Sequence, residues 1–346
     1  MKKRLVIGLI LVLSASLGFT AQPASADDGS TVLKIIEKIA PGILKETVDD
    51  PARLVSRIEG AGGSALVKLI AKAPDASKNV SLAVNYVRRT LQSSKGLTVL
   101  SGDDPSTFAL TQSTKFGFRI LTALTAAPST NKFDYTFDLP ANATLQMTAT
   151  GYLIVNGDMV LGALSKPWAM DSNGQKLTTH FEWQNRVLTQ VLDEDISRIS
   201  YPVILDPAWG YTKQYPLKYS PEVNFAKLQT CFNCYFPVPG APYAYPRIGQ
   251  LLPLTILGEK FECTMGPTYQ FPGYREFQFN ATRNHIDGYG SSISFQMTKV
   301  GSGYALIVQG YIVRDFTLVG NSIYVAGAWS MWQLFADNLN VPRVNI

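Results

Sequence analysis

The sequence predicts a mainly β protein with a helical N-terminal segment, which is an α+β fold overall with two antiparallel β domains. Three observations predict this fold class. From about residue 97 onward, apolar residues recur with the period of two that is typical of half-buried strands. Aromatic residues make up 11% of the 346 residues, and 27 glycines and 20 prolines favour many turns. Before residue 97, apolar residues recur instead at helical spacing.

The first 26 residues have the layout of a signal peptide. A basic stretch at Lys2–Arg4 precedes the apolar run Leu5–Phe19, and Ala24–Ala26 supplies the small residues of a cleavage site. The apolar run is shorter than the roughly 20 residues that span a bilayer. No second run of that length follows. The sequence therefore predicts a secreted, extracellular product, either free or associated with the cell wall, with no transmembrane segment after cleavage.

The charge balance of the mature chain is nearly even. Cleavage after Ala26 removes three of the 31 basic residues and none of the 26 acidic ones, which leaves 28 basic residues against 26 acidic ones. No cluster of basic residues longer than Arg88-Arg89 occurs. A nucleic-acid partner is therefore not expected. No motif indicates a cofactor.

The segment 27–96 is predicted to be helical. Its apolar residues fall at helical spacing, and Pro41-Gly42 interrupts the first helix. An amphipathic helix of this kind could lie on a membrane surface or pack in a soluble domain. Packing is favoured because the helices are short and their charges are mixed. The apolar positions and segments are Val32, Ile36, Ile39 and Ile43, then 64–72, then 77–91.

The segment 97–210 is predicted to be an antiparallel β domain. Apolar residues alternate over 133–139, which indicates a strand. Asn156-Gly157 suits a type I′ turn, so Tyr152–Val155 and Met159–Leu161 are expected to form a hairpin. A second hairpin is expected where 184–186 turn the chain into Val187–Leu192. Asp206 precedes a proline and is expected to cap its own backbone.

Residues 133–210 carry a pattern that resembles a known module. The most specific part is its end, Tyr201-Pro202-Val203 followed by Asp206-Pro207, and Pro167-Trp168-Ala169 with Asp171 opens it. This pattern resembles an uncharacterised β-rich module of secreted proteins from Gram-positive, mainly high-GC, bacteria. The resemblance implies secretion and architecture but no activity. His180 departs from it, since an aromatic residue is expected there. The resemblance alone suggests a further alternative, an exported toxin or effector.

The C-terminal part is divided into a linker over 211–225 and a disulfide-stapled β domain over 226–346. This domain is predicted to be a sandwich or small barrel with a terminal helix. Its CF…FPVPGAP and HIDGYGSSISF blocks look like parts of an uncharacterised secreted domain. The expected strands are 274–280, 292–298, 304–313 and 323–328, and the expected helix is 329–338.

The three cysteines are an odd number for an oxidising compartment, so one bridge and one free thiol are expected. Cys231 and Cys234 have the spacing of a redox pair but lack the surrounding βαβ pattern. A structural bridge between Cys231 and Cys263 is favoured, with Cys234 as the alternative partner or the free thiol. Such a loop of about 30 residues is worth roughly 3–4 kcal/mol. A four-ligand zinc site is not expected, because the chain has only two histidines, far apart. Asp193-Glu194-Asp195 could hold Ca²⁺, but a solvated turn is favoured because the spaced oxygens of a binding loop are missing, so no metal site is predicted.

His285 and Asp287 are the sharpest candidates for catalysis. They lie between two predicted strands, where an imidazole near a carboxylate could act as an acid/base pair. Ser291, Ser292 and Glu276 are further candidate participants. The alternative, which is favoured, is that His285 caps or bonds its own loop, because no nucleophile elbow or metalloprotease helix accompanies it.

Tyr235, Tyr243 and Tyr245 belong to an aromatic set interleaved with proline and glycine. Such rings could stack on sugars or on peptide chains. They could equally anchor proline-rich loops to a β core, and this interpretation is favoured.

The function predicted from these observations is non-catalytic binding. A secreted β-rich protein would bind an unknown extracellular or cell-wall ligand through its C-terminal domain. The alternative is a secreted hydrolase with a site around His285 and Asp287.

Overall fold

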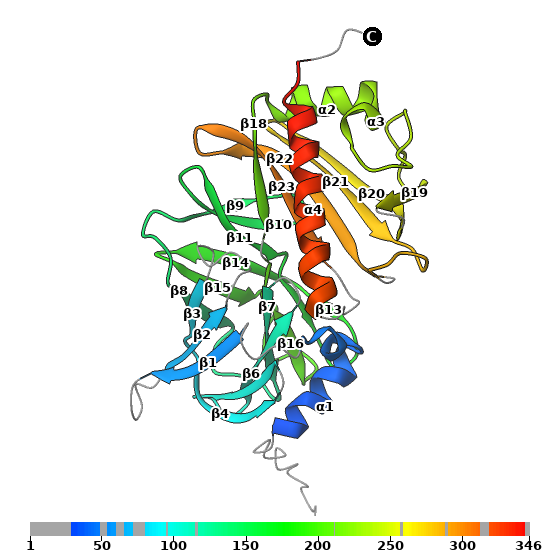
Figure 1. Cartoon of the computed structure of the whole chain (residues 1–346). Coiled ribbons are helices and arrows are strands. Elements are labelled where there is room, and N and C mark those ends of the chain that lie inside the picture. Colours follow the sequence, from blue (N-terminus) through cyan, green and yellow to red (C-terminus); the bar gives the residue numbers. More distant parts are fainter. Residues whose placement is uncertain are drawn as a thin grey trace, which may run out of the picture.

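The computed structural model describes residues 29–48, 54–59, 66–71, 80–94, 96–114, 117–210, 212–256, 259–287, 290–311 and 318–342. The expected signal peptide lies outside these ranges. The chain is mostly strand, as predicted, and forms two β-rich units. One comprises the described residues up to 210 and the other comprises those from 212 onward (Figure 1).

The N-terminal unit contains two antiparallel sheets. The six-stranded sheet has, in spatial order, β1 (Leu54–Glu59), β2 (Leu66–Ala71), β3 (Val80–Val84), β8 (Lys132–Phe137), β15 (Val187–Leu192) and β14 (Thr179–Gln184). The eleven-stranded sheet has β13 (Lys176–Leu177), β12 (Trp168–Met170), β16 (Val203–Asp206), β7 (Gly117–Leu124), β17 (Ala208–Gly210), β11 (Met159–Ser165), β10 (Gly151–Asn156) and β9 (Thr144–Met147). A branch from β7 adds β6 (Thr107–Thr114), β5 (Leu97–Gly102) and β4 (Val87–Ser94).

The core of this unit lies between the two sheets. Tyr135 and Phe137 of β8 pack with Phe118 of β7 and Trp209 of β17 in one buried cluster. Alternation along β7 sends the neighbouring side chains to its other face. There, Leu121 packs against the helix α1 (Gly29–Ile39), which a short 3-10 helix (Ile43–Glu46) follows.

The expected helical segment over 27–96 is correct only at α1. The described residues between 54 and 94 form the strands β1 to β4 instead. In β3, Val80, Leu82 and Val84 are buried while Ser81 and Ala83 between them are half-buried. The apolar positions that suggested a helix therefore also satisfy a period of two, and β-branched residues favour the strand.

The hairpin that joins β10 and β11 is confirmed, but its turn is not type I′. Asn156 pairs with Met159, so Gly157 and Asp158 form the turn. Only Gly157 has a positive φ, whereas type I′ requires two such residues. The hairpin of β14 and β15 does have two, Asn185 and Arg186.

Asp206 does not cap its own backbone. Its carboxylate accepts a hydrogen bond from Nε1 of Trp168 at 2.6 Å and lies 3.2 Å from Nε of Arg119. Asp206 is 2% exposed. It therefore ties β16 to β12 and β7 through its side chain, and joins the two ends of the 167–210 stretch.

The C-terminal unit is built on one six-stranded antiparallel sheet with helices. Tyr215 and Phe295 of the sheet share a buried cluster with Phe232 of α3 and with Trp332 and Phe335 of α4. Helix α4 runs across the sheet (Figure 1). The sheet order is β18 (Lys213–Leu217), β23 (Gly303–Tyr311), β22 (Ser292–Val300), β21 (Tyr274–Ala281), β20 (Glu259–Phe271) and β19 (Leu251–Ile256). The helices are α2 (Pro221–Thr230), α3 (Phe232–Tyr235) and α4 (Leu318–Leu339).

Two sequence predictions in this part are wrong. The expected linker over 211–225 contains β18 and the start of α2, because Ser220 caps the helix and Pro221 opens it. The expected strand over 323–328 lies within α4, which extends the predicted terminal helix toward the N-terminus.

The two units meet through the polar face of the C-terminal sheet. Glu276 is fully buried and accepts a hydrogen bond from Thr150 of the N-terminal unit at 2.9 Å. Tyr274 and Gln296 also donate to this carboxylate. Beside this network, a small apolar cluster joins β10 and β11 to β23. The opposite face of the sheet is left to pack against α4.

Candidate ligand-binding pocket

A cavity of about 280 Å³ lies between the C-terminal sheet and α4. Strands β19 to β23 supply most of its wall, and Phe236 and Val238 continue that wall after α3. Trp332 from α4 lines the side opposite the sheet. The side chains that line it are mainly apolar, which is the character of a small-molecule site. The apolar lining comprises Phe236, Val238, Leu254, Ile256, Phe261, Phe279, Ala281, Ile286, Ile293, Ala328 and Trp332.

Three of the polar lining residues come from the connection between β21 and β22, and Glu259 of β20 and Ser292 of β22 also line the cavity. His285, Asp287 and Ser291 all lie in this connection and all line the cavity. His285 is 8% exposed and Asp287 is 6% exposed. Ser291 Oγ donates to the main-chain carbonyl of Asp287 at 2.8 Å, which ties these two residues together. The predicted pair His285 and Asp287 is thus placed at a pocket.

The hydrogen bonds of His285 fix the position of its proton. Nδ1 accepts a hydrogen bond from the main-chain N–H of Asp287 at 3.0 Å. The ring packs edge-on against Phe261, with the ring centroids 5.2 Å apart. A neutral imidazole with an occupied acceptor at Nδ1 carries its proton on Nε2. His285 therefore offers a donor, not a base, to anything within reach of Nε2.

Burial shifts the pKa of two side chains that line the pocket, His285 and Cys263, toward their neutral forms. It lowers the pKa of His285, although the nearby Asp287 carboxylate opposes this effect. Burial, together with the charges of Asp287 and Glu262, raises the pKa of the Cys263 thiol to about 12. Cys263 donates a hydrogen bond to the carbonyl of Phe261 at 3.0 Å. Neither side chain is prepared as a nucleophile at neutral pH.

The geometry disfavours the hydrolase interpretation. In a catalytic triad, the carboxylate accepts from Nδ1–H and leaves Nε2 free to take a proton. Here Asp287 Oδ2 lies 3.7 Å from Nδ1 of His285, beyond hydrogen-bond distance, and the tautomer is the opposite one. Ser291 and Ser292 line the pocket as expected. Glu276 does not, because it lies on the other face of the sheet.

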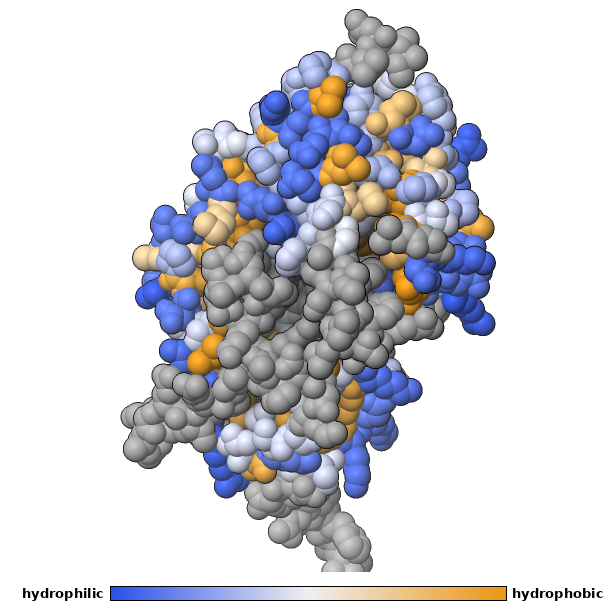
Figure 2. All heavy atoms as spheres, in the orientation of Figure 1, coloured by the Kyte–Doolittle hydropathy of each residue, from blue (hydrophilic) through white to orange (hydrophobic). Residues whose placement is uncertain are grey.

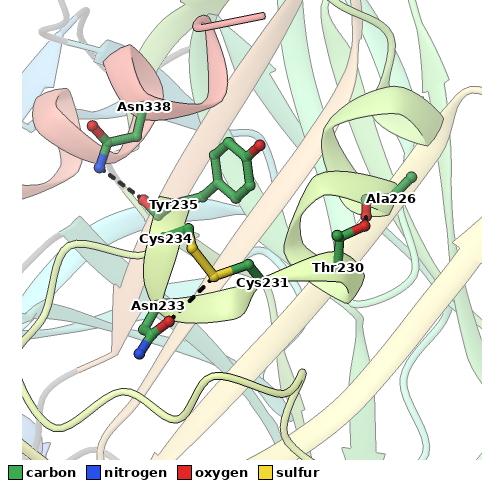
Figure 3. The surroundings of a disulfide bond; sticks show 7 residues. All are labelled: Ala226, Thr230, Cys231, Asn233, Cys234, Tyr235 and Asn338. Atoms are coloured by element: carbon green, nitrogen blue, oxygen red, sulfur yellow. Dashed lines mark hydrogen bonds between the residues drawn. A yellow bond between two sulfur atoms is a disulfide. The ribbon is translucent and has the colours of Figure 1, made fainter. Parts of the chain in front are cut away.

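The expected bridge between Cys231 and Cys263 is replaced by one between Cys231 and Cys234. Figure 3 shows this disulfide, which joins Cys231 at the N-cap of α3 to Cys234 inside that helix. The carbonyl of Tyr235 in the same helix accepts a hydrogen bond from Asn338 of α4 at 3.0 Å. Cys263 is free and buried. It faces the pocket from β20, a position that sequence spacing does not reveal.

The tyrosines expected to bind ligand are mostly structural. Tyr235 is buried, and Tyr245 packs its ring against Phe225 with the centroids 5.1 Å apart. Only Tyr243 of the three is well exposed, at 58%. Figure 2 shows that hydrophobic residues of the described part are interspersed with hydrophilic ones on the face it displays. The rings therefore serve mainly as anchors, and the pocket is the better candidate site.

Sequence reasoning missed the residues that α4 contributes to the pocket. The sequence predicts a strand over 323–328, which contains Gly327, and a helix over 329–338, which contains Trp332, whereas both residues lie in the single helix α4. Gly327 is informative, because no described atom lies within 4 Å of a Cβ built there. A glycine in a long helix was the one available signal of open space beside it.

The described part of the chain has no helix that is long and apolar enough to cross a membrane. Within the same ranges, no group of three or more His, Cys, Asp or Glu side chains is placed to hold a metal ion.

No family model and no curated protein matches the chain. Among solved structures, it is similar to the X-ray crystal structure of protein MLL2253 from Mesorhizobium loti, with a TM-score of 0.30 and 12% sequence identity. That match covers 39% of this chain and 98% of the other. This likeness is too weak to indicate a function.

Proposed function

We propose that the protein is an exported, non-catalytic binding protein whose C-terminal unit holds a small apolar molecule between α4 and the sheet. The observation that carries this proposal is the cavity of about 280 Å³ with its largely apolar wall. Binding would bury the apolar surface of the ligand and would give the side chains of the cavity wall van der Waals contacts that they lack when the cavity is empty. The ligand would come from the cell envelope or from the extracellular medium.

Two features of the sequence support export. The basic start followed by Leu5–Phe19 and by Ala24–Ala26 has the order of a signal peptide. The bonded pair of Cys231 and Cys234 suits an oxidising compartment.

Binding is favoured over hydrolysis because of His285. Its Nδ1 already accepts the N–H of Asp287, so Nε2 has no lone pair with which to activate a nucleophile. The only thiol that lines the pocket has a pKa raised to about 12. A binding site needs neither group to react.

The direct test uses an uncharged fluorescent probe, N-phenyl-1-naphthylamine, whose emission rises in apolar surroundings. Wild-type protein is expected to bind it. Gly327→Leu is expected to weaken binding at least tenfold, because the new side chain projects into space that no described atom occupies. This substitution also replaces a helical glycine, so it favours folding.

Gly303→Leu is the matched control. Gly303 is exposed at the start of β23, has open space around a built Cβ and does not line the pocket. It is expected to leave probe binding unchanged. Equal binding by wild type and Gly327→Leu would place the probe elsewhere and refute the proposed site.

A further inference from the structure

One end of the pocket presents a hydrogen-bond donor that the described residues leave without a partner. Nδ1 of His285 is occupied by the N–H of Asp287, which leaves the proton on Nε2. The imidazole is 8% exposed and lines the cavity. Nε2 of His285 is not one of the fully buried polar atoms, so a molecule in the cavity with an acceptor oxygen can accept its hydrogen bond in largely apolar surroundings.

The charges around the cavity restrict the molecule further. No lysine or arginine occurs among the described lining residues, whereas Asp287 and Glu259 both occur there. An anionic head group would therefore be buried near like charge, and the described lining residues offer it no counter-ion. An ammonium head group has no lone pair to accept from Nε2–H of His285. An uncharged oxygen meets both conditions.

We propose that the ligand is an uncharged amphipathic molecule whose single carbonyl or hydroxyl oxygen accepts a hydrogen bond from Nε2–H of His285. This inference rests on the proposed function and specifies its ligand class. The volume of about 280 Å³ is nearly twice that of a cavity of roughly 150 Å³ known to hold benzene. A ligand with on the order of ten carbon atoms fits this volume.

The test compares four ten-carbon probes: decane, 2-decanone, decanoate and decylamine. Each is titrated at pH 7.5 against wild-type protein loaded with N-phenyl-1-naphthylamine, and displacement gives its affinity. The same titrations are made with His285→Asn. The asparagine Oδ1 can still accept the N–H of Asp287, while the donor at Nε2 is lost.

The expected result is selective. His285→Asn should weaken 2-decanone about fivefold to tenfold, the effect of one hydrogen bond made in an apolar site, and should leave decane unchanged. Wild type should bind decanoate and decylamine at least tenfold more weakly than 2-decanone. Equal losses for 2-decanone and decane would overturn this inference while leaving the proposed function standing. Tighter binding of either charged probe would also overturn it. Failure of wild type to bind any apolar probe would refute the proposed function itself.

A measurement on wild-type protein keeps the test decisive if His285→Asn does not fold. The infrared carbonyl stretch of bound 2-decanone should lie at lower wavenumber than that of 2-decanone in hexane, because the carbonyl accepts a hydrogen bond. A bound stretch at the hexane position would show that no donor reaches the oxygen, and the inference would fail.

Discussion

Lys227 holds the C-terminal end of α4, and its replacement by methionine is expected to loosen that end. The side chain is 1% exposed, and its ammonium donates to the carbonyls of Leu339 and Val341 at 2.5 and 2.8 Å. It also lies 3.9 Å from the ring centroid of Tyr219. A cation at a helix C-terminus is favourable, since the last carbonyls lack partners within the helix.

The expected loss for Lys227→Met is about 2 kcal/mol. Leu339 is buried, so its carbonyl would lose its partner at about 1–3 kcal/mol. Val341 is exposed, so water can replace the second bond at little loss. Methionine retains most of the apolar stem. The substitution also removes a buried positive charge, whose burial is unfavourable and lowers the pKa of Lys227. Removal of this unfavourable burial offsets the lost contact between the ammonium and the ring of Tyr219.

Hydrogen exchange measured by mass spectrometry is the assay. A loss of about 2 kcal/mol in the opening free energy corresponds to roughly 30-fold faster exchange in the last turns of α4. Lys218→Met is the control, because Lys218 is exposed. It should change stability by no more than about 0.5 kcal/mol. Equal exchange in the two variants would refute the role assigned to Lys227.

Three further predictions concern buried and bonded groups. Burial raises the pKa of Glu276, so the folded protein holds the proton of this carboxyl more tightly than the unfolded chain does. The resulting stabilisation is present at low pH and is lost as pH rises above about 4.5. Glu276→Gln should therefore gain in urea unfolding free energy relative to wild type between pH 4.5 and 7.5, and parallel profiles would contradict this. Burial lowers the pKa of His285, which shares the pocket with the titratable groups of Asp287, Glu259 and Cys263. Its contribution to stability is therefore present above pH 6.5 and lost on acidification. His285→Asn should lose less stability than wild type between pH 6.5 and 5, and an equal loss would count against this. Denatured, unreduced protein should expose one thiol, and reduction should lower stability by about 2 kcal/mol, as for a four-residue loop. A peptide linking Cys263 to another cysteine would contradict the observed pairing.

Local patterns were enough to predict the hairpins. In the β14–β15 hairpin, the positive φ angles of Asn185 and Arg186 follow from the two-residue connection between paired strands. The β10–β11 hairpin was also predictable, although only Gly157 has the expected positive φ. These features depend on neighbours a few residues away, so a single sequence contains the necessary information.

The candidate site could be predicted only in part. His285 and Asp287 share one loop, so their proximity follows from the sequence, but the direction of their hydrogen bond does not. Trp332 and Phe236 are about 100 residues apart, and only the packing of α4 places both on the cavity. The same packing makes the stretch around Gly327 helical, against its strand-like composition.

By itself, the sequence determined the β-rich class, the two hairpins and the loop that carries His285, because these depend on side-chain period and on local backbone preference. Tertiary structure alone decided that Val80–Val84 is a strand and that Cys231 pairs with Cys234. It also decided that an apolar cavity opens between α4 and the sheet. The physical reason is that burial is shared among distant segments, and a segment compatible with two local structures adopts the one that its partners can bury.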